Sequence, residues 1–219
     1  MKKIAALITA LLFCTASLFA QQKAFWNDIQ SFKKQDSINP QPQQAILFIG
    51  SSSFTKWHDV QNYFPNNKII NRGFGGSTLP EVSGYVNDIV FPYHPKQVVV
   101  YCGDNDLASS DTITATTVAN RFKNLFQIIR TQLPDASIVY VSIKPSPSRQ
   151  KLMPKMQEVN DAIKKFLKKQ RNTAFVDVYH KMLNADGSIM SDIFIEDKLH
   201  MNAKGYAIWQ KEIQPVLKN

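Results

Sequence analysis

Four short segments contain the residue types that acyl transfer requires. They are a serine run, a glycine-rich turn, a Gly-Asp-Asn-Asp sequence and an Asp-x-x-His pair, at residues 50–53, 71–76, 103–106 and 197–200. Acyl transfer needs a nucleophilic hydroxyl, a base that takes its proton and an acid that orients the base. It also needs hydrogen-bond donors for the negatively charged oxygen of the tetrahedral intermediate. Together the four segments supply all of these groups.

The predicted catalytic triad consists of Ser52, Asp197 and His200. Ser52 follows an apolar strand, where a helix start would present its hydroxyl as the nucleophile. His200 can be the base, and Asp197, three residues earlier, can reach the imidazole from the same turn. The predicted oxyanion hole combines the backbone N–H groups of Ser52 and Gly76 with the side-chain amide of Asn105.

Each segment also has an explanation without catalysis. A serine run after a strand is a common helix N-cap, and taken alone this is the more frequent outcome. Paired glycines can form only a tight turn, and the Gly-Asp-Asn-Asp sequence lacks the ligand spacing of an EF-hand. Asp197 and His200 can be ordinary capping residues. The occurrence of all four segments in one chain is what favours an active site.

In this order the segments resemble those of the SGNH (GDSL-type) hydrolases. The family's Gly-Asp-Ser nucleophile sequence corresponds to residues 50–52, and its oxyanion glycine to Gly76. Its Gly-x-Asn-Asp sequence corresponds to residues 103–106, and its Asp-x-x-His sequence to residues 197–200. The resemblance covers nearly the whole chain beyond residue 20, includes residues 142–147, and looks like a secreted bacterial branch of the family. It implies an ester hydrolase with an α/β fold.

Ser51 is a departure from the family pattern, because it replaces the aspartate that normally precedes the nucleophile. That aspartate is not a triad member in the family, and a hydroxyl can also support the loop. The substitution leaves open which of Ser51, Ser52 and Ser53 attacks the substrate. The alignment of Gly50 with the family glycine favours Ser52.

Five residues are candidate contacts of the substrate in the cleft: Ser51, Phe54, Trp57, Phe74 and Arg149. The three aromatic residues flank the predicted oxyanion loops, although packing in the core explains each of them equally well. Arg149 follows a proline-rich turn and can meet an acidic group of the substrate. An ordinary solvated arginine is the alternative.

The histidines give no sign of a metal site. No pair of them has the spacing of metal ligands, so the sequence predicts neither a catalytic metal nor another cofactor. Asp104, Asp106 and His200 alone would suit a metallophosphoesterase. The further His and Asp ligand segments of such an enzyme are missing.

Apolar runs typical of buried strands alternate with amphipathic helical patterns along the chain. The expected strands are residues 45–49, 68–71, 97–102, 137–143 and 173–178. This alternation predicts an α/β protein, a three-layer α/β/α sandwich with a mostly parallel, flavodoxin-like five-stranded sheet. In such sheets ligands bind beyond the carboxyl ends of the strands, which is where the first three chemical segments begin.

The first twenty residues have the pattern of a signal peptide. Lys2 and Lys3 precede an apolar run that ends at Ala20, and the domain at 21–219 follows, beginning with a helix and a proline-rich connector over 23–44. We therefore expect export to the periplasm or beyond, without stable membrane insertion after cleavage. An uncleaved anchor and a lipoprotein modified at Cys14 are the alternatives. Cleavage would leave Cys102 as the one cysteine, so no internal disulfide is possible.

The formal net charge of +9 does not point to nucleic acid. Much of it lies in residues 149–171, where apolar residues recur at helical spacing, so the basic side chains fit the solvated face of a helix. No nucleic-acid motif accompanies them, and we expect no nucleic-acid partner. Weak attraction to acidic glycans or membrane surfaces remains open.

Hydrolysis of a carboxylic ester is the function that these features favour. We expect a small-molecule or carbohydrate ester as the substrate, with deacetylation of a carbohydrate as the first guess. The family that the chain resembles also includes lysophospholipases and thioesterases. A long apolar lid segment would argue for a bulky lipid substrate, and the sequence shows none. A catalytically silent, glycan-binding protein is the alternative from another class. The sequence leaves the acyl group, the alcohol and the oligomeric state open.

Overall fold

A computed structural model describes residues 23–218, so the predicted signal peptide and Cys14 lie outside the described residues. Five parallel strands form one sheet in the order β2-β1-β3-β4-β5. The strands are β1 (Ile46–Gly50), β2 (Ile69–Gly73), β3 (Gln97–Tyr101), β4 (Ser137–Val141) and β5 (Thr173–Val176). The predicted flavodoxin-like parallel sheet is confirmed.

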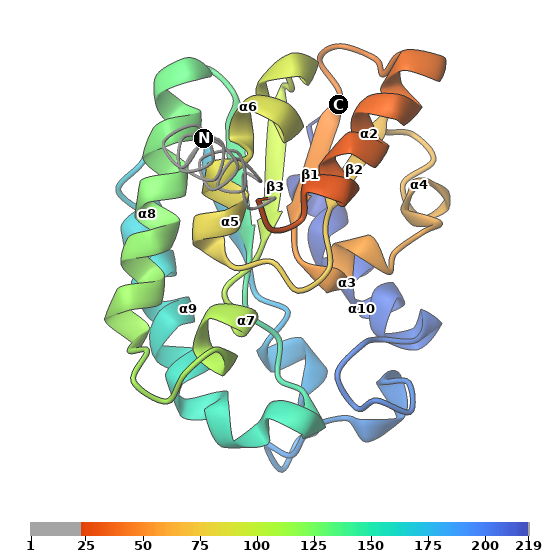
Figure 1. The fold of residues 1–219 in the computed structure, drawn as a ribbon. Helices are drawn as coiled ribbons and strands as arrows, with labels where there is room; N and C mark the ends of the chain where they lie inside the picture. The colour runs from red at the N-terminus through yellow and green to blue at the C-terminus, as the bar shows by residue number, and fades with distance from the viewer. Residues whose placement is uncertain (1–22, 219) are drawn as a thin grey trace, which may run out of the picture.

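Helices cover both faces of this sheet, as predicted (Figure 1). One face carries α2 (Trp26–Ile38), α5 (Leu79–Gly84), α6 (Val86–Ile89), α8 (Ala115–Gln132) and α9 (Met153–Leu167). The other face carries α3 (Ser52–Thr55), α4 (Val60–Tyr63) and α10 (Ala203–Ile213). Connections contain α7 (Asp104–Ala108) and the 3₁₀ turns η1 (Phe91–Tyr93), η2 (Pro147–Leu152), η3 (His180–Met182), η4 (Ser191–Ile193) and η5 (Gln214–Val216).

The two covered faces explain why the central strands are apolar throughout. Every residue of β1, β3 and β4 is buried. In β1, Leu47 and Ile49 pack toward α5 and α8, whereas Ile46 and Phe48 pack toward α3 and α10. This alternation is the two-residue period of a strand with a core on each side.

Polar side chains cap the starts of α8 and α10. The Thr114 hydroxyl accepts a hydrogen bond from the Thr117 N–H, at 3.1 Å, at the start of α8. Asn202 accepts from the N–H groups of Lys204 and Gly205 at the start of α10. Such caps satisfy donors that have no partner within the helix. None of the helices in residues 23–218 combines the length and apolar character needed to cross a bilayer.

The carboxyl ends of three strands meet in register at one edge of the sheet. Gly50, the last residue of β1, pairs with Gly73 on one side and Tyr101 on the other. Gly50 has a φ of +134°, and a Cβ atom there would lie 1.8 Å from the Tyr101 carbonyl oxygen. Only glycine therefore lets the chain turn here, and the turn leads directly into Ser52.

Candidate active site

Ser52, His200 and Asp197 form a continuous hydrogen-bonded chain at this edge. The Ser52 Oγ lies 2.8 Å from His200 Nε2, although the two residues are 148 positions apart in the sequence. His200 Nδ1 lies 2.6 Å from Asp197 Oδ2 on the other side of the ring. This is the geometry that a serine nucleophile, its base and an orienting acid require.

A tight turn before α10 holds both Asp197 and His200. The other carboxylate oxygen of Asp197 accepts hydrogen bonds from the backbone N–H groups of Leu199 and His200, at 2.9 and 2.8 Å. Lys198 adopts a φ of +55°, and the Ile195 N–H donates to the His200 carbonyl at 2.9 Å. The turn thereby fixes the imidazole relative to its carboxylate.

The hydrogen bonds of Asp197 also fix its charge. Burial by itself would raise the pKa of this carboxyl, but the hydrogen bonds from His200 and Leu199 outweigh it and lower the pKa to about 2. Asp197 is therefore ionised at neutral pH, and its negative charge favours the imidazole tautomer with a proton on Nδ1. Nε2 is then the acceptor that faces the Ser52 hydroxyl.

Of the three serines in the run, only Ser52 reaches His200. Ser51 and Ser53 are fully buried, and among the described residues the Ser51 hydroxyl has no hydrogen-bond partner. The structure thus corrects the assignment of Ser51 as a substrate contact. It also places Ser52 alone in reach of the base.

The predicted oxyanion donors lie on neighbouring loops around Ser52. A Cβ atom on Gly75 would lie 3.8 Å from Ser52 Cβ, and the next residue, Gly76, has a φ of +85°. Asn105 Nδ2 donates to the Ser77 carbonyl oxygen at 3.0 Å, which joins the loop after β3 to the loop after β2. The structure brings all three predicted donor residues to one place, and their role as an oxyanion hole stays a prediction.

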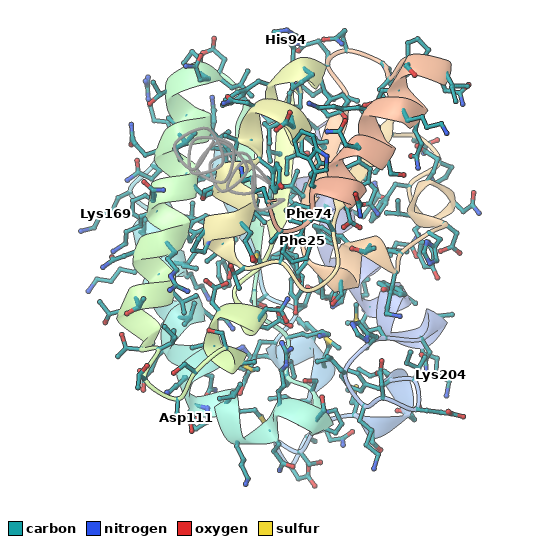
Figure 2. All side chains as sticks on the ribbon, in the orientation of Figure 1. Phe25, Phe74, His94, Asp111, Lys169 and Lys204 are labelled. Carbon is teal, nitrogen blue, oxygen red and sulfur yellow. The ribbon has the colours of Figure 1, made fainter. Side chains whose placement is uncertain are left out.

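The glycine loop after β2 is packed against the first described residues of the chain. Figure 2 shows Phe25 beside Phe74, and the two ring centroids are 5.2 Å apart. A Cβ on Gly76 would lie 3.9 Å from the Phe25 ring. The Tyr85 hydroxyl donates to the Ala24 carbonyl at 2.6 Å, which fixes this segment on α5 and α6. No sequence pattern indicated that Phe25 contacts the site.

The three aromatic residues proposed for the cleft do not line it. Phe54, Trp57 and Phe74 are fully buried. Phe54 and Trp57 pack with Tyr206 and Trp209 of α10, with the Trp57 and Tyr206 rings stacked at 4.7 Å. Phe74 packs on the opposite face, against Phe25 and Tyr85. This prediction was wrong because the rings on both sides of the site pack inward, into the two cores of the sheet.

Arg149 is neither a solvated side chain nor a free substrate contact. Only 17% of the side chain is exposed, and Nη1 lies 2.9 Å from Asp104 Oδ2. Its Nη2 donates to Asn105 Oδ1 at 2.8 Å. The guanidinium therefore binds two protein groups, one of which is the predicted oxyanion amide.

Asp106 is a structural residue that the sequence analysis left without a role. Its carboxylate is fully buried, accepts from the Leu79 N–H at 2.9 Å and pairs with Arg121 at 2.8 Å. Burial raises the pKa of Asp106 above its ordinary value, although the hydrogen bonds from Arg121 and Leu79 act in the opposite direction. Asp106 thus links the segment that follows the Gly76 loop to the segment that carries Asn105.

Lys144 is a second buried cation near the site. Its Nζ lies 3.9 Å from Asp104 Oδ2 and 3.4 Å from the Tyr101 hydroxyl. Burial lowers the pKa of Lys144 to about 8. Asp104 consequently has two buried or half-buried cations beside it, Lys144 and Arg149.

Beside η2 and α7 the surface is hollowed into a cavity of about 760 Å³. Its lining includes Leu107, Asp111, Pro147, Gln150 and Lys151, together with Arg149. Residues 23–218 contain no group of three His, Cys, Asp or Glu side chains arranged to hold a metal ion.

A parallel α/β sheet with a Ser–His–Asp chain at its carboxyl edge is the architecture of an α/β ester hydrolase. The model of the GDSL-like lipase/acylhydrolase family matches residues 46–208. The chain therefore belongs to this family, as its four segments predicted, and its place in a secreted bacterial branch stays a prediction.

Known relatives and solved structures agree with this assignment. Subunit alpha2 of platelet-activating factor acetylhydrolase IB, from Rattus norvegicus and from Homo sapiens, is 30% identical over 179 residues, which cover 74% of this chain and 71% of the relative. A GDSL-like lipase from Bacteroides thetaiotaomicron has a TM-score of 0.73 at 20% identity, covering 86% of this chain and 96% of that one. An acetylxylan esterase from Geobacillus stearothermophilus has a TM-score of 0.64 at 13% identity, covering 80% and 94%. At these identities the two structures show a common fold.

Proposed function

We propose that this protein is an exported serine ester hydrolase that removes short acyl groups, with an O-acetylated carbohydrate as the first candidate substrate. The observation that carries the proposal is the hydrogen-bonded chain from Ser52 through His200 to Asp197. A binding protein has no need of an ionised carboxylate, an oriented imidazole and a hydroxyl in this sequence of contacts.

In the acylation step Ser52 Oγ attacks the carbonyl carbon of the ester while His200 Nε2 takes its proton. The negative charge that develops on the carbonyl oxygen is stabilised by hydrogen bonds from the backbone N–H groups of Ser52 and Gly76 and from the side-chain amide of Asn105. The intermediate collapses when His200 donates the proton to the alcohol oxygen, and the alcohol leaves. Asp197 keeps its negative charge throughout and stabilises the imidazolium.

Deacylation repeats the same steps with water. A water molecule attacks the acyl-Ser52 carbonyl carbon as His200 Nε2 takes one of its protons. The second intermediate then breaks the bond to Ser52 Oγ, which regains its proton from His200, and the carboxylic acid is released.

The names of two relatives support a short acyl group. One is an acetylhydrolase that acts on platelet-activating factor, and the other is an acetylxylan esterase, so both names specify an acetyl group on different alcohols. A shared fold does not establish a shared substrate, so the alcohol part of the proposed ester is an analogy with these proteins. Export is proposed on the signal-peptide pattern of residues 1–20.

A panel of esters tests this function. The purified protein should hydrolyse p-nitrophenyl acetate faster than the octanoate, and should release acetate from acetylated xylo-oligosaccharides. Preference for long acyl chains, lysophospholipids or acyl thioesters would replace the proposed substrate by the corresponding lipase or thioesterase type. Glycan binding without any hydrolysis would identify a catalytically silent protein.

A further inference from the structure

The side-chain amide of Asn105 has two different ends, and only one of them can stabilise an oxyanion. Nδ2 carries two N–H donors, whereas Oδ1 is an acceptor that would repel a negative charge. One Nδ2 hydrogen is directed at the Ser77 carbonyl oxygen, 3.0 Å away. The proposed oxyanion hole therefore depends on an amide that keeps this orientation and has its second N–H available.

Arg149 bonds the opposite end of the same amide. Its Nη2 donates to Asn105 Oδ1 at 2.8 Å. A guanidinium has donors and no acceptor, so only the oxygen end of the amide can face it. Rotation of the amide by 180° would break this bond and place two donors against each other. The contact with Arg149 thus selects the orientation that directs N–H groups away from the arginine.

A buried carboxylate holds the guanidinium itself in place. Arg149 Nη1 lies 2.9 Å from Asp104 Oδ2, and only 4% of the Asp104 side chain is exposed. The Tyr101 hydroxyl donates to the same oxygen at 3.3 Å. The contact with Asp104 is an ion pair, because Nη1 makes no hydrogen bond to any of the described residues. The hydrogen bond from Nη2 to Asn105 Oδ1 fixes the direction of the guanidinium, and an ammonium group has no second arm that could reach both partners.

We propose that Arg149 is a positioning residue for the oxyanion hole, acting through Asn105 without touching the substrate. This inference rests on the proposed function, because it has a consequence only if an oxyanion forms. The positive charge at Oδ1 also polarises the amide, which strengthens Nδ2–H as a donor. A direct salt bridge to an acidic substrate is the competing role, and Arg149 already has Asp104 and Asn105 as partners.

A double-mutant cycle separates these roles. The enzymes to compare are wild type, Arg149→Met, Asn105→Ala and the double variant, assayed on p-nitrophenyl acetate and on an ester with a carboxylate on its acyl group. Arg149→Met should lower kcat by about 10- to 100-fold and leave KM within about twofold on both esters. In the Asn105→Ala background the same substitution should change kcat by less than about twofold, because the group it positions is gone.

Lys165→Met is the matched control for charge. Lys165 is exposed on α9, so its replacement removes one positive charge without contact to Asn105 and should leave kcat unchanged. Arg149→Lys keeps a charge that can pair with Asp104, and it remains informative if Arg149→Met fails to fold. It should melt close to wild type and still lose at least about tenfold in kcat.

The following results would overturn the inference. The first is that Arg149→Met lowers kcat by the same factor in the wild-type enzyme and in Asn105→Ala. The second is that Arg149→Met raises KM for the anionic ester alone. The third is a folded Arg149→Lys enzyme with wild-type kcat. If wild-type protein neither hydrolyses esters nor reacts with a fluorophosphonate, the proposed function fails and this inference fails with it. Activity in the wild type with no effect of Arg149 would overturn the inference alone.

Discussion

At the scale of single residues, the site is a set of polar groups whose partners decide what each can do. Asp197 orients His200, His200 faces Ser52, and Arg149 binds Asn105. Each of these contacts restricts a side chain to the one orientation that acyl transfer can use. Asn105 and Asp197 have different roles in this set, so their replacement should have different effects on kinetics and stability.

Replacing Asn105 by alanine should mainly lower kcat. The amide is worth most when negative charge accumulates on the carbonyl oxygen, so its loss should cost on the order of 10²–10³ in kcat, with little change in KM. Steady-state kinetics on a short-chain ester, paired with a melting curve, check this. A variant with normal kcat and a lowered melting temperature would show that Asn105 only stabilises its turn.

Asp197 should make stability depend on pH in the acid range. Its pKa in the folded protein is about 2, below the ordinary value of 3.8 that applies to the unfolded chain. Between these values the unfolded state binds more protons, so the stabilisation is present above about pH 4 and is lost as the pH falls through 2. Urea unfolding should show a smaller acid-induced loss for Asp197→Asn than for wild type. Identical pH profiles would contradict the assignment.

At the residue scale, the sequence predicted contacts between residues close in the chain but not contacts between distant ones. An Asp-x-x-His spacing places both groups on one turn, so Asp197 and His200 could be paired without a structure. The partner of Arg149 lies 44 positions away and depends on how one amide is rotated. No local pattern encodes such a relation. The same limit hid the contact of Phe25 with the glycine loop.

At the scale of elements, three strands and their loops bring the reacting groups together. The ends of β1, β2 and β3 meet in register. The loop after β2 is bonded to the end of β1, where the Phe74 N–H donates to the Gly50 carbonyl at 2.9 Å. Parallel strands put all their carboxyl ends on one edge, which is why this edge could be predicted. The inward packing of Phe54 and Trp57 could not, because a helix as short as α3 gives too few residues to define its buried face.

Phe25 should support the glycine loop and not merely the fold. Phe25→Ala removes the ring that lies against Phe74 and next to Gly76. The loosened loop should lower kcat by about three- to tenfold with KM nearly unchanged, because the Gly76 N–H is then less well oriented. Trp26→Ala is the control, since Trp26 is the next residue and is 42% exposed. Equal kcat values in the two variants would refute a role for Phe25 in the site.

At the scale of the whole molecule, helices on both faces of one sheet leave a single carboxyl edge for chemistry. The α/β sandwich and its parallel sheet followed from the alternation of apolar runs and amphipathic helices, because that pattern is a global property of the chain. The basic side chains of residues 164–171 lie on α9 and just after it, with Lys165, Lys168 and Lys169 exposed. Lys165 thus lies on the outer face of α9 that the sequence predicted. Lys168 and Lys169 follow the helix, and Arg149, at the start of the basic segment, is paired with Asp104.

Cys102 offers a probe of the stability of this core. It is fully buried at the end of β3, and burial raises the pKa of its thiol well above the ordinary value. In protein that begins after residue 20 it is the one cysteine, so a thiol reagent should react only when the sheet opens. The labelling rate should rise with urea in parallel with the loss of circular dichroism. Fast labelling of native protein would contradict the packing around β3.

The central claim is that Ser52 becomes covalently acylated, and intact-protein mass spectrometry after treatment with a fluorophosphonate tests it most directly. Wild-type protein and Ser51→Ala should each gain the mass of one phosphonyl group, mapped by peptide sequencing to Ser52. Ser52→Ala should gain none and retain less than a tenth of wild-type turnover while melting as a folded protein. Labelling at Ser51 or Ser53, or a folded Ser52→Ala variant with more than a tenth of wild-type turnover, would contradict the account.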